Sequence, residues 1–217
     1  AETDFLLDLA SEHDFIQGVV GWVDLCLEQI NERLDYYSQF TKLRGFRHIL
    51  QAEAPEFILR PEFQRGIAAL QDYGFTYDIL IYPKHLPNSL KLVQNHPGQL
   101  FVIDHLAKPD IKNGRFEGWD AGLKAIAAHD NVYCKLSGMI TESDLKSWTK
   151  EDIFPYMDKA FEAFGAERLM FGSDWPVCKL AGEYGVVCEL VDEYLSKLSI
   201  SEQEMVWGQN AKHFYNL

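Results

Sequence analysis

The segment RLMFGSDWPV, residues 168–177, has the pattern of a buried strand that ends in polar residues. The apolar triplet LMF is followed by Gly-Ser-Asp, and Pro176 cannot donate to a strand ladder, so the strand must end before it. In parallel α/β folds, the working residues lie just beyond the carboxyl ends of the strands. Asp174 occupies such a position, where a carboxylate can bind a metal or accept a proton from water. The alternative is a helix cap or an Asx-turn that closes the loop.

Five similar segments precede this one along the chain. They are VVGWV from Val19, LRGFRHIL from Leu43, FTYDILIY from Phe75, LFVIDHL from Leu100 and VYCKL from Val132. Consecutive starts, including Arg168, lie 24 to 36 residues apart, which is the length of one strand, one helix and two short loops. This alternation fits either an open doubly wound sheet or a barrel, and no Gly-x-Gly-x-x-Gly follows a strand to favour the sheet.

The intervening stretches have helical periodicity and recognisable ends. A helix is expected from about Thr3 to His13, and Phe63, Ile67 and Leu70 share one face of another helix that begins near Pro61. The spacing of Trp119, Leu123 and Ile126 is the same. Two pairs, Thr149 with Asp152 and Ser201 with Glu204, predict helix caps, because the hydroxyl accepts an orphan backbone N–H and the acid favours the positive helix end.

The predicted strand ends are unusually polar. They carry Trp22 and Asp24; Arg47 and His48; Tyr82, Lys84 and His85; His105 and Lys108; Lys135 and Ser137; and Ser173, Asp174 and Trp175. A barrel brings all of these residues to one rim, whereas an open sheet scatters several of them. The pattern therefore predicts a (β/α)8 TIM barrel that forms a single domain over residues 1–217.

Composition limits the classes of partner. The chain has 217 residues, 47% of them hydrophobic, and a net charge of −13, which repels nucleic acid and anionic membrane. No apolar run reaches the length of a membrane-spanning helix. We therefore expect a small-molecule substrate, no nucleic-acid or membrane partner, and possible assembly as a homo-oligomer. The four cysteines form no Cys-x-x-Cys pair, which predicts reduced thiols in a cytoplasmic protein.

Several strand-end residues are candidates for the site. His105 can ligate a metal or polarise a carbonyl, the alternative being a core histidine satisfied by backbone groups. Arg47 and His48 point to opposite faces of their strand, and the forked donors of Arg47 suit an anionic or polyhydroxyl substrate. Lys135 either holds a substrate carboxylate or closes a salt bridge with a neighbouring acid. Trp175 either packs at the rim or stacks on a sugar ring. Asp104 is interpreted as a buried, orienting acid.

At FRHILQ, FVIDHLAKP, NVYCKLSG, RLMFGSDWPV and GQNAKHFY, the sequence resembles the metal-dependent hydrolases of the amidohydrolase-2 group. The likeness covers essentially the whole chain and is closest to L-fuconolactone and L-rhamnonolactone hydrolases, with pyrone-dicarboxylate lactonase more distant. It implies a (β/α)8 barrel with the site at the carboxyl-terminal rim. By this resemblance, His105 matches the histidine of the sixth strand, Asp174 the catalytic aspartate of the eighth, and Arg47 a substrate-binding arginine of the fourth.

The sequence departs from the family in one respect. Family members begin with a strand that carries His-x-His, followed by a second strand, and this sequence contains no His-x-His. We therefore expect this chain to lack the first two strands, and with them two metal ligands. The six remaining strands should then curve around one axis and leave unpaired edges at the first and last strand.

The expected chemistry is hydrolysis of a sugar lactone or a related cyclic ester. Asp174 activates the water, and His105, a divalent metal such as zinc, or both polarise the carbonyl. Arg47, Lys135 and Trp175 position the substrate, and only His105 and Asp174 remain as metal ligands. One alternative is a decarboxylase of the same superfamily. Another alternative is a barrel remnant that binds a ligand without catalysing a reaction. Because two metal ligands of the family are expected to be missing, this chain by itself is a candidate for an inactive form.

Overall fold

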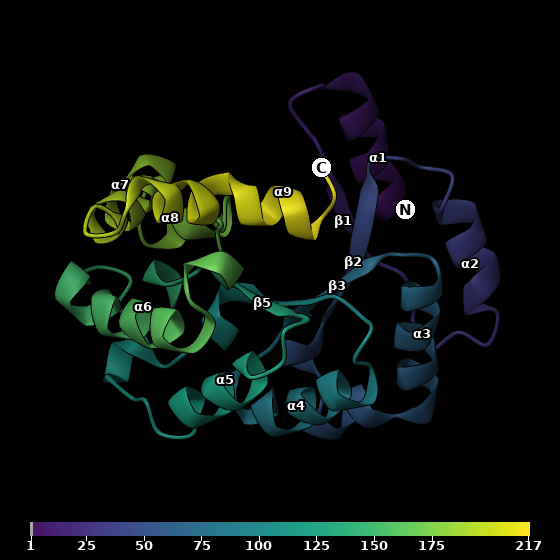
Figure 1. Cartoon of the computed structure of the whole chain (residues 1–217), viewed down its shortest axis with the longest axis horizontal. Helices are drawn as coiled ribbons and strands as arrows, with labels where there is room; N and C mark the ends of the chain where they lie inside the picture. Colours follow the sequence, from purple (N-terminus) through teal and green to yellow (C-terminus); the bar gives the residue numbers. More distant parts are fainter. Residues whose placement is uncertain (1) are drawn as a thin grey trace.

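The computed structural model describes residues 2–217 and contains one sheet of six parallel strands in the order β1 to β6 (Figure 1). The strands are β1 (Val19–Gly21), β2 (Leu43–Ile49), β3 (Thr76–Leu80), β4 (Phe101–Ile103), β5 (Val132–Leu136) and β6 (Leu169–Phe171). The helices are α1 (Glu2–Glu12), α2 (Ile30–Tyr37), α3 (Pro61–Asp72), α4 (Leu86–Asn95), α5 (Trp119–Ala127), α6 (Lys150–Phe164), α7 (Tyr184–Leu195), α8 (Ile200–Glu204) and α9 (Asn210–Phe214).

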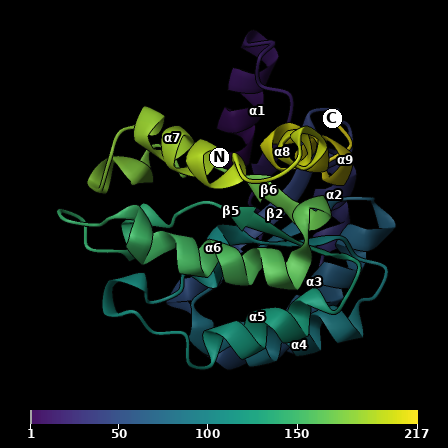
Figure 2. The ribbon, with the colours of Figure 1, turned by 60° about the vertical axis from the view of Figure 1, so that its left-hand side comes forward.

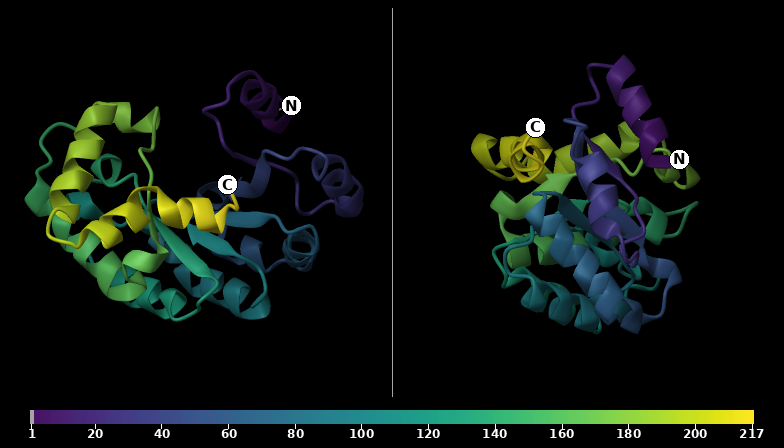
Figure 3. Two further views of the ribbon diagram at one scale, coloured as in Figure 1. Left: turned by 45° about the horizontal axis from the view of Figure 1, so that its top comes forward. Right: turned by 90° about the vertical axis from the view of Figure 1, so that its right-hand side faces the viewer.

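Strand order distinguishes a barrel from an open doubly wound sheet. Each strand pairs in parallel with its neighbours along the chain, without the reversal of order that a doubly wound sheet requires. Helices α3 to α6 follow one another along one face of the sheet (Figure 2), and the sheet curves inside them (Figure 3). This half-barrel confirms the prediction of six consecutive parallel strands. Within residues 2–217, β1 and β6 are each paired on one side only.

The strands are shorter than the apolar runs that predicted them. The fourth run extends from Leu100 to Leu106 in the sequence, but β4 ends at Ile103 because the backbone turns at Asp104. In the sixth run, β6 ends at Phe171, immediately before Gly172. The polar residues of both runs therefore lie in the loops beyond the strands, at the edge where a barrel places its site.

The helices bury the faces that their periodicity predicted. Phe63, Ile67 and Leu70 are buried on α3, with Pro61 at its first position, where the missing N–H costs nothing. On α5, Trp119 is the largest of the fully buried side chains and is 1% exposed. These residues belong to the main core, between the sheet and its covering helices.

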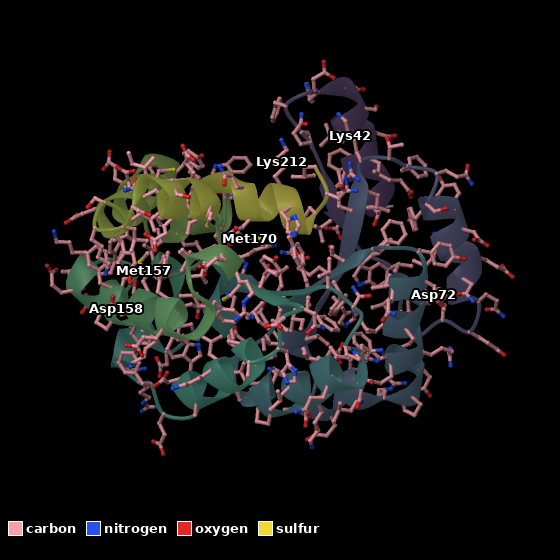
Figure 4. The ribbon with its side chains drawn as sticks, viewed as in Figure 1. Lys42, Asp72, Met157, Asp158, Met170 and Lys212 are labelled. Atoms are coloured by element: carbon pink, nitrogen blue, oxygen red, sulfur yellow. The ribbon has the colours of Figure 1, made fainter. Side chains whose placement is uncertain are left out.

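A second, smaller cluster lies on the opposite face of the sheet. Val102 of β4 and Met170 of β6 pack there against Phe214 of α9, and Met170 is labelled in Figure 4. Val102 alternates with Phe101 and Ile103, which belong to the main core, so the strand is buried on both faces. The last turn of the chain thus covers the inner face of the half-barrel.

One of the two predicted helix caps is correct. Thr149 and Asp152 form a reciprocal capping box at the start of α6. At α8, however, the cap is Ser199 with Glu202, and the predicted pair Ser201 and Glu204 is wrong. Both pairs have the same spacing, and only the direction of the incoming chain selects between them. Ser199 has the extended backbone of a cap, whereas Ser201 lies within the helix.

This pair of serines provides a matched test of the fold. Replacing the capping hydroxyl in Ser199→Ala should lower the free energy of unfolding by about 1 kcal/mol, since a backbone N–H of α8 loses its acceptor. Ser201→Ala removes the same atoms two residues away and should change stability by less than about 0.5 kcal/mol. Urea unfolding of both variants measures the difference, and equal effects would contradict the assignment of the cap.

The structure also describes the cysteines and the lengths of the helices. All four cysteines are free thiols. In residues 2–217, every helix is too short or too polar to cross a bilayer.

Candidate active site

His105 and Asp174 meet at the carboxyl-terminal edge of the sheet. His105 follows β4 and Asp174 follows β6, and Nε2 of the imidazole lies 3.6 Å from Oδ1 of the carboxylate. Their side chains are 12% and 10% exposed, so both reach solvent in part while most of each side chain is shielded. Residues 69 positions apart in the sequence are thus adjacent because the strands that carry them are separated only by β5.

The backbone at both positions adopts the left-handed region. Residues 105–108 have φ values between 51° and 57°, and Asp174 has a φ of 55°, although none of them is glycine. Such conformations cost energy for residues with a Cβ atom and cluster at functional sites, where the surrounding structure holds them in place. Here the buried indole of Trp119 donates a 2.6 Å hydrogen bond to the carbonyl of Leu106. This contact holds the loop that carries His105.

Ser137 is a site residue that sequence reasoning did not select for catalysis. Its Oγ lies 2.7 Å from Nδ1 of His105, on the side of the ring away from Asp174, and the residue is 1% exposed. Two glycines make room for the contact. A Cβ on Gly138, which also has a φ of 66°, would lie 2.8 Å from Cβ of His105. One on Gly172 would lie 2.9 Å from Cβ of Ser137.

The serine, histidine and aspartate resemble a nucleophilic triad, but their exposures are reversed. In a triad the serine faces the substrate and the acid lies behind the imidazole. Here Ser137 is buried behind the ring, and Asp174, on the other side of the ring, is the partly exposed residue. The hydroxyl of Thr141 lies 3.3 Å from Oδ2 of Asp174 and 2.9 Å from the carbonyl oxygen of Gly138. The arrangement therefore favours a carboxylate that acts on water over a serine that attacks the substrate.

A network of charged side chains lies on the inner face of the half-barrel, next to this pair. The ammonium of Lys135 lies 2.6 Å from Oδ2 of Asp78 and 2.8 Å from Oδ1 of Asp104. Arg47 donates from Nη1 to Oδ2 of Asp104 at 3.1 Å. The hydroxyl of Tyr215, near the end of the chain, donates to Oδ2 of Asp78 at 2.8 Å. Asp104 directly precedes His105, so the network joins the loop that carries His105 to the carboxyl-terminal segment.

Burial and neighbouring charges shift the pKa values in opposite directions. Burial raises the pKa of Asp78, and the charge of Lys135 only partly offsets it. Burial also acts on Asp104, but Lys135 and Arg47 outweigh it and hold the pKa of Asp104 below its usual range. Burial disfavours the charged form of Lys135, yet its two carboxylates raise its pKa well above the ordinary value. Burial lowers the pKa of His105, although the charges of Asp104 and Asp174 oppose this shift.

The remaining predicted residues lie around this centre. The side chain of Arg47 is 42% exposed, so its guanidinium contacts Asp104 and still faces solvent. Both contacts of the Lys135 ammonium are with the protein's own carboxylates, which is the salt-bridge alternative; its role towards substrate stays a prediction. Trp175 is 64% exposed at the rim. His48 lies apart from the centre and stacks on Phe57, with 5.2 Å between the ring centroids.

A second ion pair links the loops of the site. The ammonium of Lys108 pairs with the carboxylate of Glu142, and both side chains are largely buried. Lys108 ends the left-handed run that begins at His105, and Glu142 follows Thr141, which contacts Asp174. The pair therefore fastens the loop after β4 to the loop after β5.

The residues described here only partly suit a catalytic metal. Nε2 of His105 and a carboxylate oxygen of Asp174 can serve as two donors, but a catalytic zinc site normally has three protein ligands. Residues 2–217 contain no group of three or more histidine, cysteine, aspartate or glutamate side chains arranged to hold an ion. The two donors of His105 and Asp174 are one fewer than this number.

The whole chain matches the model of one known protein family. The Amidohydro_2 family, described as amidohydrolase, matches residues 1–217. The chain belongs to the amidohydrolase family. Its resemblance to that family, read from the strand-end motifs, is thereby confirmed.

Three relatives within the amidohydrolases are close to this chain. An L-fucono-1,5-lactonase of Burkholderia multivorans is 42% identical, over 100% of this chain and 77% of that protein. The L-fucono-1,5-lactonase of Burkholderia ambifaria is 38% identical, over 100% and 76%. A crystal structure of an amidohydrolase from B. multivorans with bound zinc superimposes with a TM-score of 0.95 at 41% identity, covering 99% of this chain and 78% of that one.

The buried network yields a stability prediction. Lys135→Met removes the cation shared by Asp78 and Asp104 and leaves buried carboxylates uncompensated, so unfolding should become easier by about 3–5 kcal/mol. Lys159→Met is the matched control, because Lys159 pairs with Glu162 on the surface of α6, where an ion pair contributes about 1 kcal/mol or less. Chemical denaturation at pH 7 compares the two variants. A Lys135→Met protein as stable as the control would show that the network carries no stability.

Proposed function

We propose that this amidohydrolase hydrolyses a sugar lactone, of which L-fucono-1,5-lactone is the best candidate. The supporting observation is the His105–Asp174 pair at the carboxyl-terminal rim, whose members lie 3.6 Å apart and are both partly exposed. The substrate class comes from the relatives, since two proteins 42% and 38% identical to this chain are L-fucono-1,5-lactonases. In lactone hydrolysis a water must lose a proton and a carbonyl oxygen must be stabilised as it becomes negative.

Asp174 serves as the general base in this proposal. Its carboxylate takes a proton from a water molecule, and the water oxygen attacks the carbonyl carbon of the lactone. The tetrahedral intermediate then collapses, the bond between that carbon and the ring oxygen breaks, and the leaving alkoxide takes the proton back from Asp174. The product is an open-chain hydroxy acid, and Asp174 returns to its starting state. Thr141, 3.3 Å from Oδ2, helps to orient the carboxylate.

His105 stabilises the oxyanion, and Ser137 determines which ring nitrogen carries the proton. The contact between Ser137 Oγ and Nδ1 is short, and the serine is 1% exposed, so its hydroxyl proton needs an acceptor within the protein. Donation to Nδ1 satisfies that proton and leaves the hydrogen of the neutral ring on Nε2. Nε2–H then lies on the side of the ring that faces Asp174. In the proposed reaction, this N–H donates to the developing oxyanion.

The substrate is held by the residues around this pair. Arg47 presents its guanidinium to solvent beside Asp104, and its forked donors suit the hydroxyl groups of a sugar. Trp175, exposed at the rim, offers a flat face for the apolar side of the ring. Lys135 acts on substrate by holding Asp104, and through it Arg47, in place. Zinc is the candidate metal, for which His105 and Asp174 would supply two ligands. The free thiols fit a cytoplasmic location.

The role of Asp174 can be tested with an isosteric substitution. Asn keeps the size of the side chain but accepts no proton from water, so Asp174→Asn should lower turnover of L-fucono-1,5-lactone by about 100- to 10,000-fold. Its melting temperature should change little. Acid release in a pH-stat and thermal unfolding are measured on one preparation. A clear loss of melting temperature with preserved turnover would favour the loop-closing role, and a wild-type chain without lactonase activity would contradict the proposed function.

The role of Ser137 can be tested on the ring of His105 itself. In ¹⁵N NMR spectra the wild-type protein should show a protonated Nε2 and an unprotonated Nδ1. Ser137→Ala should shift this population and lower kcat by about 10-fold or more, with a smaller change in KM. Ser143→Ala is the matched control, because its buried hydroxyl donates to the carbonyl of Ile140 and does not reach His105. A wild-type ring protonated on Nδ1 would contradict the assigned tautomer.

A further inference from the structure

A cavity of about 550 Å³ lies at the amino-terminal end of the strands, opposite the edge that carries His105 and Asp174. It is bounded by the starts of β2 and β3, by Leu100 before β4, and by residues 213–216 at the end of the chain. Its volume is within the range of small-molecule sites. The cavity is therefore large enough for a small ligand and is separate from the proposed active site.

Arg44, the second residue of β2, is the only charged residue contributed to this cavity by the sheet. Its Nε is buried and has no hydrogen-bond partner. Each of the other six arginines, all within residues 2–217, makes a hydrogen bond, an ion pair or a contact with an aromatic ring. Arg44 makes none of these within the same part of the chain. A buried N–H donor such as this Nε is rarely without an acceptor in folded proteins, because it loses its water without compensation.

The lining of the cavity shows what would pair with this arginine. The chain has 33 acidic residues, yet none of the described residues that line the cavity is an aspartate or a glutamate. The walls combine aromatic side chains, among them Phe40, Tyr73, Phe75 and Phe214, with small polar ones such as Ser38 and Thr41. A guanidinium binds a carboxylate through two parallel hydrogen bonds, and aromatic side chains form flat apolar walls for a ring. The acceptor that Arg44 lacks would therefore come from a ligand.

We propose that this cavity binds a small organic carboxylate that carries an apolar ring, with the guanidinium of Arg44 paired to the carboxylate. The ring lies between the aromatic walls. The hydroxyl of Tyr215, which also lines the cavity, donates to Asp78 in the charged network. A ligand in the cavity thus contacts the residue that connects the carboxyl terminus to that network. The proposal depends on the cavity and Arg44 alone and is independent of lactone hydrolysis.

Benzoate is a suitable probe because it combines one carboxylate with one flat apolar ring. Titration of the ¹⁵N-labelled chain should give saturable shifts of the backbone amides of Thr41, Thr76 and Asn216, which line the cavity. Arg44→Gln should weaken the affinity by about 10-fold or more, which corresponds to about 1.4 kcal/mol. Arg44→Lys should retain part of it. Benzamide, which has the same ring without the charge, should bind more weakly than benzoate to the wild-type chain.

The matched control is Arg60→Gln, which removes the same charge from a surface residue paired with Glu62 and should leave benzoate binding unchanged. Far-UV circular dichroism of Arg44→Gln checks that the fold is intact, and Arg44→Lys carries the test if it is not. Three outcomes would overturn the proposal: no saturation at about 10 mM benzoate, shifts confined to the surroundings of His105 and Asp174, or equal affinity in Arg44→Gln. Equal binding of inorganic phosphate would overturn the requirement for a ring.

Discussion

The ammonium of Lys135, held between the carboxylates of Asp78 and Asp104, is the contact on which the organisation of this half-barrel depends. It connects β3, the loop after β4, and β5 on the inner face of the sheet. Both carboxylates are almost completely buried, with side-chain exposures of 1% and 0%. Two buried acids repel each other and are poorly solvated, so the sheet can tolerate them only with a cation between them. Arg47 donates a further hydrogen bond to Asp104, and Tyr215 donates one to Asp78.

The position of the His105–Asp174 pair follows from this network. Asp104 is fixed by Lys135 and Arg47, and the next residue, His105, enters a left-handed backbone that strand geometry does not allow. The imidazole is thereby directed towards Asp174 on one side and Ser137 on the other. Contacts with buried groups keep this loop in its strained conformation. The side chains of His105 and Asp174 are therefore held next to each other at an otherwise shielded edge. Such preorganisation supplies much of the stabilisation of developing charge in enzymes.

The same constraint explains why the two ends of the sheet differ. At the carboxyl-terminal edge, the charged residues of the network are paired with one another, and His105 and Asp174 lie beside them as a separate pair. At the amino-terminal edge, the buried Nε of Arg44 has no hydrogen-bond partner among the described residues, although the chain is strongly acidic. The aromatic residues that surround it come from loops and from the chain terminus. An arginine in that setting is typical of a ligand site more than of a structural ion pair.

The sequence alone determined the alternation of strands and helices, the polar strand ends, and the position of His105 and Asp174 at one edge of the sheet. These features are local: a strand has a period of two, a helix a period of 3.6, and a residue that follows a parallel strand lies at its carboxyl edge whatever the partners are. The six consecutive parallel strands were predictable on that basis, whereas the amidohydrolase family was predicted from the resemblance of the motifs. The absence of two further strands is an expectation from the family pattern that the fold itself does not test.

Only the tertiary structure decided which polar residues pair. Ser137 reaches His105 across 32 residues and Lys135 reaches Asp78 across 57, and no local pattern encodes contacts at those separations. For the same reason the sequence left Lys135 open between substrate and salt bridge, and it placed a helix cap at Ser201 where the incoming chain selects Ser199. Partner choice depends on the register of neighbouring strands and the path of loops, which are set by packing of the whole sheet against its helices.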